Sequence, residues 1–324
     1  MNRTDSNQKK PALSIIMPVY NDENYLEQTL GSALRQTLQN IELICIDDGS
    51  TDGSLNILSA FQEKDNRVHV ITQKNQGAGP ARNAGLAAAE GEYIAFLDSD
   101  DFYPDDDCMK KLYDFAAAHQ ANIAGGSLLY YEDGKISEAA IGATDFTFRE
   151  IKKIRYRDFQ QPYYYQRFIY SREMLEDASI AFPAYSRFQD VVFFVKAMSE
   201  ADSFWAMDTP VYIYRKSNKF ASLSDRQIND MLRGYIDVMN LSKEKDYRDL
   251  FAFLSQRICG NTPVSKMVLA SIQSGNQEAE RSYSEITRIS ETMQEKLPAN
   301  TKTQTERIPM RGLRKLLRSL FPRP

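Results

Sequence analysis

The sequence has few of the residues that build metal ribbons, disulfide scaffolds or membrane spans. Its 324 residues include two histidines and three cysteines, and Cys45, Cys108 and Cys259 are too far apart to form a CxxC pair. This excludes a zinc ribbon and a disulfide scaffold and fits a reducing compartment. No apolar run is long enough to span a bilayer, and the polar residues 1–11 do not resemble a signal peptide. We therefore expect a cytoplasmic protein.

An excess of positive charge is also missing. The formal net charge is −4 at pH 7, so no overall basic field attracts nucleic acid, and we expect no nucleic-acid partner. Hydrophobic residues make up 42% and charged residues 26%, which is typical of a folded globular chain. At roughly 150 residues per domain, this length predicts about two domains.

Four short apolar runs alternate with helical patterns near the start of the chain. Buried parallel strands are continuous apolar runs, and strands that alternate with helices favour a parallel sheet covered by helices. The sequence therefore predicts an α/β fold with a mostly parallel, Rossmann-like sheet. Ligands bind at the carboxyl ends of the strands in such sheets. The runs are residues 13–20, 41–46, 68–71 and 93–97, and the polar residues at or beyond their ends are Tyr20, Asp47, Asp48, Arg82, Asp98 and Asp100.

The composition changes along the chain predict four segments. Residues 1–11 are a disordered leader, and residues 12–220 form the α/β domain, with mixed α and β patterns after residue 104. Residues 221–304 contain many helix-forming residues and few strand patterns, so we expect a helical C-terminal extension. Residues 305–324 form a basic amphipathic tail.

Asp98 and Asp100 follow an apolar run and form a DxD pattern. Two carboxylates at a strand end are suited to hold a divalent cation together with phosphate and water. A solvated acidic turn is the structural alternative. An EF-hand is disfavoured because Phe102 and Tyr103 stand where a ligand and a glycine are needed. A phosphatase of the DxDx[TV] type is disfavoured by the same Phe102.

Two further loops carry candidate ligand-binding residues. After Gly77 and Gly79, the third glycine of a dinucleotide fingerprint is replaced by Arg82, so either this is a tightly packed helix entry or Arg82 is a fixed cation beside a phosphate. Asp47 and Asp48 begin a loop in which Asp, Ser and Thr residues cap the next helix. Asp48 is also suited to accept the N–H of a pyrimidine, with Tyr20 stacked on the base.

Together these segments resemble the family 2 glycosyltransferases, which have the GT-A fold. The resemblance covers about residues 12–215, with the motifs in order, and it implies that residues 12–220 are a nucleotide-sugar transferase domain. The stretches that carry it are Ser14-Ile-Ile-Met-Pro-Val-Tyr-Asn21, Ile46-Asp-Asp-Gly-Ser-Thr-Asp-Gly-Ser54, Asn75-Gln-Gly-Ala-Gly-Pro-Ala-Arg-Asn-Ala-Gly85, Phe96-Leu-Asp-Ser-Asp-Asp101 and the later segment Phe188-Gln-Asp-Val-Val-Phe-Phe-Val-Lys-Ala-Met198.

The resemblance also implies a role for each matching residue. Asp98 meets the ribose and metal region, and Asp100 binds Mn²⁺ or Mg²⁺ that bridges the diphosphate. Arg215 or Lys219 contacts the diphosphate, although both residues also fit ordinary surface cations. The residues implied for the nucleotide, whose base we expect to be uracil, are Pro18, Tyr20, Asp48 and Arg82.

Asp190 is the general base that the resemblance implies for the acceptor hydroxyl. Many family members have Glu-Asp where this chain has Gln189-Asp190, and the second acid is the one retained. The structural alternative is an N-cap of the helix that follows. The QxxRW motif of the family's processive synthases is absent, which favours transfer of a single sugar.

The basic tail differs in charge from the rest of this acidic chain. Within residues 307–324, five large apolar residues recur at helical spacing, and most of the arginines lie off that stripe. This pattern indicates peripheral attachment to the inner face of an anionic membrane, with packing onto the protein as the alternative.

Together, the motifs predict an inverting, metal-dependent glycosyltransferase that acts on a glycan or lipid-linked acceptor in bacterial surface polysaccharide or lipopolysaccharide synthesis. A phosphatase or nucleotidyl enzyme and a non-catalytic nucleotide-binding scaffold are the alternatives.

Overall fold

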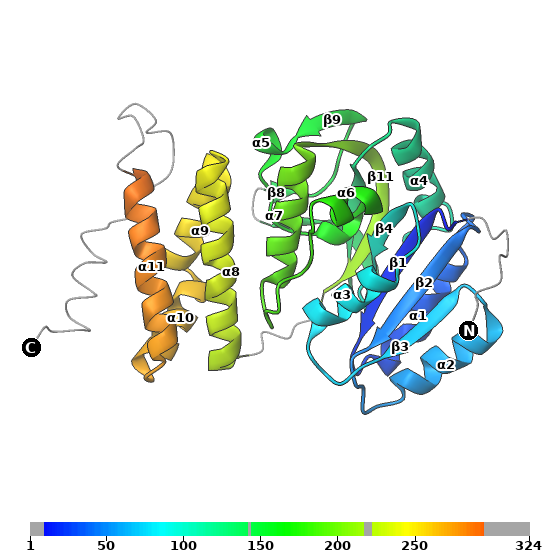
Figure 1. Ribbon diagram of the computed structural model, residues 1–324, viewed down its shortest axis with the longest axis horizontal. Coiled ribbons are helices and arrows are strands. Elements are labelled where there is room, and N and C mark those ends of the chain that lie inside the picture. Colours follow the sequence, from blue (N-terminus) through cyan, green and yellow to red (C-terminus); the bar gives the residue numbers. More distant parts are fainter. Residues whose placement is uncertain (1–9, 142–143, 217–221, 295–324) are drawn as a thin grey trace, which may run out of the picture. The chain divides into compact units, whose positions relative to one another are not determined.

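The computed structural model describes residues 10–141, 144–216 and 222–294 (Figure 1). The chain divides into two compact units, one that ends at Ala221 and one that begins at Ser222. The tail at 305–324, the first nine residues and Lys219 lie outside the described residues, so the expectations for them stay predictions.

The four predicted apolar runs form the first four strands of a nine-stranded sheet. Strands β1, β2, β3 and β4 pair only in parallel with one another, in the order β3-β2-β1-β4. All seven residues of β1 and of β2 are buried, as expected for strands covered on both faces. The elements of this half are β1 (Leu13–Val19), α1 (Glu23–Leu34), β2 (Ile41–Asp47), α2 (Ser54–Lys64), β3 (Val68–Thr72), α3 (Ala78–Ala88) and β4 (Tyr93–Phe96).

The sheet continues beyond β4 with mixed pairing. Strand β10 is antiparallel to β4 and β5, whereas β11 is parallel to β5 and antiparallel to β9. The strands after residue 104 therefore extend the same sheet, except for β7 and β8, which form a separate two-stranded sheet. The elements of this second half are α4 (Cys108–Ala118), β5 (Ile123–Glu132), β6 (Lys135–Glu138), β7 (Ala140–Ile141), β8 (Thr144–Asp145), β9 (Lys152–Arg155), α5 (Tyr156–Phe159), a 3₁₀ turn (Tyr165–Arg167), β10 (Phe168–Ser171), α6 (Arg172–Asp177), α7 (Gln189–Ala201) and β11 (Ser203–Arg215).

Helices cover both faces of the sheet, as predicted. On one face, alternate β1 residues such as Ile15 and Met17 join a core with Leu30 of α1, Leu58 of α2 and Leu112 of α4. On the other face, α3 approaches so closely that a Cβ on Gly85 would lie 2.4 Å from the Ile16 side chain. Helix α7 packs there too, through rings that surround Phe96 of β4.

The second unit is helical, as the sequence predicted for the C-terminal extension. Helix α8 begins with a capping box between Ser224 and Gln227. The four helices are α8 (Asp225–Glu244), α9 (Arg248–Cys259), α10 (Pro263–Gln273) and α11 (Gln277–Gln294). Within the described ranges, none of the helices has the length and apolar character needed to cross a membrane.

Candidate active site

The parallel strands bring the predicted residues to one edge of the sheet. The register pairs Val19 with Asp47 and Asp47 with Thr72, so β1, β2 and β3 end side by side. Tyr20 follows β1 and is 48% exposed, whereas Pro18 is buried within the strand. An exposed tyrosine at this edge is available for stacking on a base.

Asp48 organises the loop that leads into α3. Its Oδ1 accepts hydrogen bonds from the Gln73 side chain (2.7 Å) and the Gln76 backbone (2.9 Å), and its Oδ2 accepts one from the Gly77 backbone (2.8 Å). Gly77 has φ +93°, a conformation that favours glycine. Asp48 therefore shapes the start of α3, and its predicted contact with a nucleobase would add to these bonds.

The turn formed by residues 98–101 follows β4 and is held by α1 and by Asp22, the residue before this helix. The Thr29 hydroxyl contacts the carbonyl oxygens of Ser99 (2.9 Å) and Asp101 (2.8 Å), and the Ser99 hydroxyl donates to Asp22 (2.5 Å). These bonds fix the backbone that presents Asp98 and Asp100.

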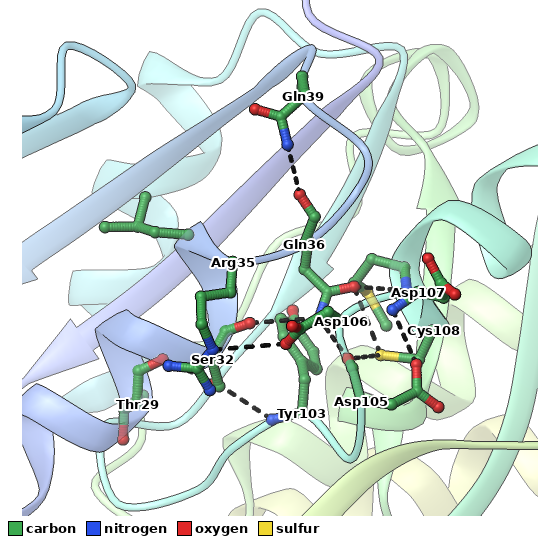
Figure 2. A network of polar contacts seen from close by, with 12 residues as sticks. Thr29, Ser32, Arg35, Gln36, Gln39, Tyr103, Asp105, Asp106, Asp107 and Cys108 are labelled. Carbon is green, nitrogen blue, oxygen red and sulfur yellow. Dashed lines mark hydrogen bonds and ion pairs between the residues drawn. The ribbon is translucent and has the colours of Figure 1, made fainter.

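The same helix also fixes the chain just beyond the turn. Figure 2 shows Ser32 of α1 and Gln36, which follows the end of α1, reaching the segment from Tyr103 to Cys108. Ser32 Oγ accepts the Tyr103 N–H (3.2 Å), and Gln36 Nε2 donates to the Asp105 carbonyl (2.6 Å). The acidic segment is therefore an ordered turn that is hydrogen-bonded to α1 and to the residues after it, and it is not a freely solvated loop.

Arg82, which is buried, and Asp98, which is half-buried, form an ion pair at the centre of the site. Arg82 Nη2 lies 2.7 Å from Asp98 Oδ1, and Gln166 Nε2 donates to Asp98 Oδ2 at 2.7 Å. The Arg82 guanidinium also lies 5.4 Å from the rings of Tyr165 and Phe182. Arg82 is thus a fixed cation, as the sequence predicted for one of its two alternatives.

Several buried polar atoms around this ion pair have no hydrogen-bond partner. Buried polar groups are normally paired, because an unpaired one costs about 1–3 kcal/mol. Donors and acceptors both occur in the set, so a ligand that carries hydroxyl or phosphate groups would satisfy them. The atoms are Arg82 Nε and Nη1, Tyr165 Oη, Gln166 Oε1 and Gln189 Oε1.

Asp190 lies in the first turn of α7, next to this cluster. The N-cap position belongs to Phe188, which has φ +68°, so the structural alternative that Asp190 caps this helix is wrong. A Cβ on Gly79 would lie only 3.2 Å from Gln189 Cγ, which shows how closely α3 and α7 approach. Burial raises the pKa of Asp190, Arg82 opposes this shift and Asp98 adds to it.

Asp100 carries the carboxylate best suited to a cation. Burial and the nearby carboxylates of Asp98 and Asp22 raise the pKa of Asp100 to about 6, although Arg215 opposes this. A divalent cation would relieve this repulsion, so the residues fit one. Within the described ranges, no group of three or more His, Cys, Asp or Glu side chains is placed to hold a metal. The other ligands would therefore have to come from diphosphate and water.

Arg215 lies at the end of β11, where its side chain is tied to the protein. Its Nε donates to the Asp100 carbonyl (2.7 Å) and its Nη2 to Gln28 (2.7 Å). Three aromatic rings surround the guanidinium, those of Tyr25, Phe102 and Tyr131 at 4.8–5.3 Å. Arg215 is thus next to the acidic turn, but it supports the turn instead of projecting freely as a surface cation.

The structure adds four residues to which the sequence reasoning gave no role. Asp22 precedes α1, Gln166 lies in the 3₁₀ turn, and Asp101 and Tyr212 form a buried pair behind Asp100. The sequence could have pointed to Asp101, because it is the last residue of the acidic motif. No sequence pattern could have pointed to Gln166, since it is 68 residues from Asp98 in the sequence.

The sheet and this edge define the GT-A class of fold. A crystal structure of S. aureus TarS 1–349 in complex with UDP-GlcNAc has the same fold, with a TM-score of 0.65 and 20% identity over 89% of this chain and 93% of that one. The model of glycosyl transferase family 2 matches residues 14–178. The chain therefore belongs to this family, as its motifs predicted.

Curated relatives agree with this assignment. The chain is 34% identical over 210 residues to the putative glycosyltransferase EpsH of Bacillus subtilis, which covers 63% of this chain and 61% of that protein. It is 32% identical over 230 residues to the minor teichoic acid biosynthesis protein GgaA of the same species, covering 66% of this chain and 49% of that protein. The chain thus spans less than two thirds of the length of these relatives.

Proposed function

We propose that this protein transfers one sugar from a nucleotide-sugar, with UDP as the expected carrier, to a hydroxyl group of a glycan or lipid-linked acceptor. The observation that carries the proposal is the set of unpartnered buried polar atoms around Arg82 and Asp98, next to the Asp190 carboxylate. A sugar diphosphate supplies both the acceptors and the donors that these atoms need. The relatives, a putative glycosyltransferase and a minor teichoic acid biosynthesis protein, support a surface glycan as the product.

The residues divide the chemistry in a simple way. Asp190 takes the proton of the acceptor hydroxyl as this oxygen attacks the anomeric carbon, and a raised pKa makes a carboxylate a better base near neutral pH. Attack from the face opposite the leaving group inverts the anomeric centre. Arg82 would hold the donor by its free N–H groups. Mn²⁺ or Mg²⁺ bound at Asp100 would offset the charge of the departing diphosphate.

The alternative of a phosphatase is less well supported by the geometry. Such an enzyme would need Asp98 as a nucleophile, and both Asp98 oxygens accept hydrogen bonds, from Arg82 and from Gln166. These bonds hold Asp98 in place and lower its reactivity. A phosphohydrolase activity that is lost in Asp98→Asn would favour this alternative.

Calorimetry with UDP and GDP, each with Mn²⁺ and then with EDTA, tests the proposal. We expect UDP to bind with Mn²⁺ and to bind at least tenfold more weakly with EDTA or in Asp100→Ala. Incubation with UDP-sugars and candidate acceptors should then give a product of inverted anomeric configuration by NMR. Preference for GDP would refute the uridine donor, and no binding of any nucleotide would refute the transferase.

Peripheral attachment to the inner face of the membrane is the remaining part of this proposal. It rests on the basic and apolar pattern of residues 307–324 and would suit a lipid-linked acceptor. Co-sedimentation with anionic vesicles should be lost when residues 305–324 are removed, and equal sedimentation of both proteins would contradict it.

A further inference from the structure

The buried pair Tyr212 and Asp101 has no part in the chemistry described above. Both side chains are fully buried, and Tyr212 Oη donates to Asp101 Oδ2 at 2.7 Å. The same Tyr212 oxygen accepts the backbone N–H of Asp98 at 3.1 Å. One phenol group thus bridges the first and last residues of the turn Asp98–Asp101.

The end of β11 contacts the rest of this turn as well. The Arg215 backbone N–H donates to Asp101 Oδ1 at 2.7 Å, and Arg215 Nε donates to the Asp100 carbonyl at 2.7 Å. Phe102 and Ile213 exchange two backbone hydrogen bonds, at 3.0 and 3.3 Å. The turn is therefore docked on β11 like a short extra piece of antiparallel sheet.

Burial of the Asp101 carboxylate is energetically unfavourable, which indicates that the docked turn has a functional role. Burying this carboxylate is unfavourable even with its two hydrogen bonds. The neighbouring carboxylates of Asp98 and Asp100 repel each other, so they would move apart if the turn were loose. A carboxylate that binds a cation has to be held in place before the cation arrives.

We propose that Tyr212 and Asp101 are positioning residues, which fix the turn on β11 so that Asp98 and Asp100 face one divalent cation and the diphosphate. The inference rests on the proposed function, because it takes Asp100 as the cation ligand. It assigns to β11 a role in donor binding through two side chains that do not themselves touch the donor.

Tyr212→Phe tests the inference, and Tyr103→Phe is its matched control. The Tyr103 ring is also buried and lies 6.4 Å from the Tyr212 ring, but its hydroxyl has no hydrogen-bond partner. Calorimetry should show Mn²⁺-dependent UDP binding at least tenfold weaker in Tyr212→Phe than in wild type. We expect wild-type affinity in Tyr103→Phe, and UDP binding in EDTA unchanged in both variants.

Melting temperatures measured in EDTA distinguish a positioning role of Tyr212 in donor binding from a role in stability alone. A lower melting temperature in Tyr212→Phe together with wild-type Mn²⁺–UDP affinity would overturn the inference, as would equal affinities in Tyr212→Phe and Tyr103→Phe. Asp101→Asn is a second test, because an NH₂ group, which cannot accept a hydrogen bond, would replace one of the two carboxylate oxygens that accept from Tyr212 and Arg215. We expect it to weaken Mn²⁺–UDP binding at least as much as Tyr212→Phe does.

The wild-type protein distinguishes failure of the inference from failure of the proposed function. If wild type binds UDP equally with Mn²⁺ and with EDTA, the cation site itself is refuted and the positioning role with it. If wild type shows the metal dependence and Tyr212→Phe retains it fully, only the positioning role is refuted.

Discussion

The two units of the chain treat their buried polar groups differently. In the helical unit, Tyr283 Oη and Asn229 Oδ1 are buried without a hydrogen-bond partner. Other buried hydroxyl groups of this unit are bonded nearby: Ser242 donates to the Val238 carbonyl, Thr287 to the Tyr283 carbonyl, and Ser290 pairs with Ser255. Such bonds within or between neighbouring helices stabilise a fold and need no ligand. The helical unit therefore has the features of a structural element.

The α/β unit differs in that several of its carboxyl groups are buried and have raised pKa values. Burial is the largest cause of the raised pKa of each of four carboxyl groups, those of Asp22, Asp100, Asp101 and Asp190. Two residues with left-handed backbone conformations, Tyr164 and Phe188, directly precede Tyr165 and Gln189 of the site. Carboxyl groups whose pKa is raised by burial and by neighbouring carboxylates are typical of a binding site. The raised pKa values of these carboxyl groups thus indicate that the α/β unit contains the ligand-binding site.

Asp190→Asn has the largest expected effect. The amide cannot take the acceptor proton, so transfer should fall by about 10²–10⁴-fold. UDP binding by calorimetry should stay within about twofold of wild type. Asp202→Asn, at the other end of the same helix, is the control and should keep its activity. Undiminished transfer by Asp190→Asn would remove Asp190 from its role as the base.

Leu254→Ala tests the helical unit. Leu254 of α9 is fully buried, so its truncation should lower the free energy of unfolding by about 2–5 kcal/mol in a urea titration. The neighbouring Phe253→Ala should cost less, because Phe253 is 39% exposed. UDP affinity of the folded Leu254→Ala protein should equal that of wild type. A tenfold weaker affinity would show that the helical unit takes part in donor binding.

Asp100→Asn should stabilise the protein in EDTA. The pKa of Asp100 is raised from 3.8 to about 6, so the folded state binds this proton more tightly than the unfolded chain does. The contribution of Asp100 to stability is therefore greatest at low pH and is lost as pH rises from about 4 to 6. Above pH 7, Asp100→Asn should raise the free energy of unfolding by about 1–3 kcal/mol.

Urea unfolding of Asp100→Asn and wild type, measured in EDTA over a range of pH, tests whether the substitution raises the free energy of unfolding. The gain should shrink as the pH falls below about 5, where the wild-type carboxyl group is protonated in the folded state. Asp106→Asn is the control, since Asp106 is an exposed residue of the same segment, and it should change stability by about 0.5 kcal/mol or less. A destabilised Asp100→Asn protein at pH 7 would mean that the carboxylate is stabilising without a cation.

Much of the fold could be predicted because its signals are local. Each of β1 to β4 is a short, mostly apolar run, and a polar motif follows soon after each strand in the chain. The parallel arrangement then brings Tyr20, Asp48 and Asp98 to one edge without further information. The family motifs added a role for each residue, and those roles stay predictions.

Other features depend on contacts that no local pattern encodes. The bond between Gln166 and Asp98 joins residues 68 positions apart, and that between Tyr212 and Asp101 joins residues 111 positions apart. In the sequence, Arg215 fitted a diphosphate contact or a surface cation, and the structure shows it among three aromatic rings beside the acidic turn.

The sequence by itself thus determined the α/β class, the helical second unit and the acidic and glycine-containing motifs at the strand ends, because hydrophobic periodicity and turn residues act over a few positions. Only the tertiary structure decided which side chains surround Arg82 and Asp98, that Asp190 lies inside a helix turn instead of capping it, and that β11 holds the acidic turn. The physical reason is that these contacts form between separate strands and helices whose packing against each other sets every distance.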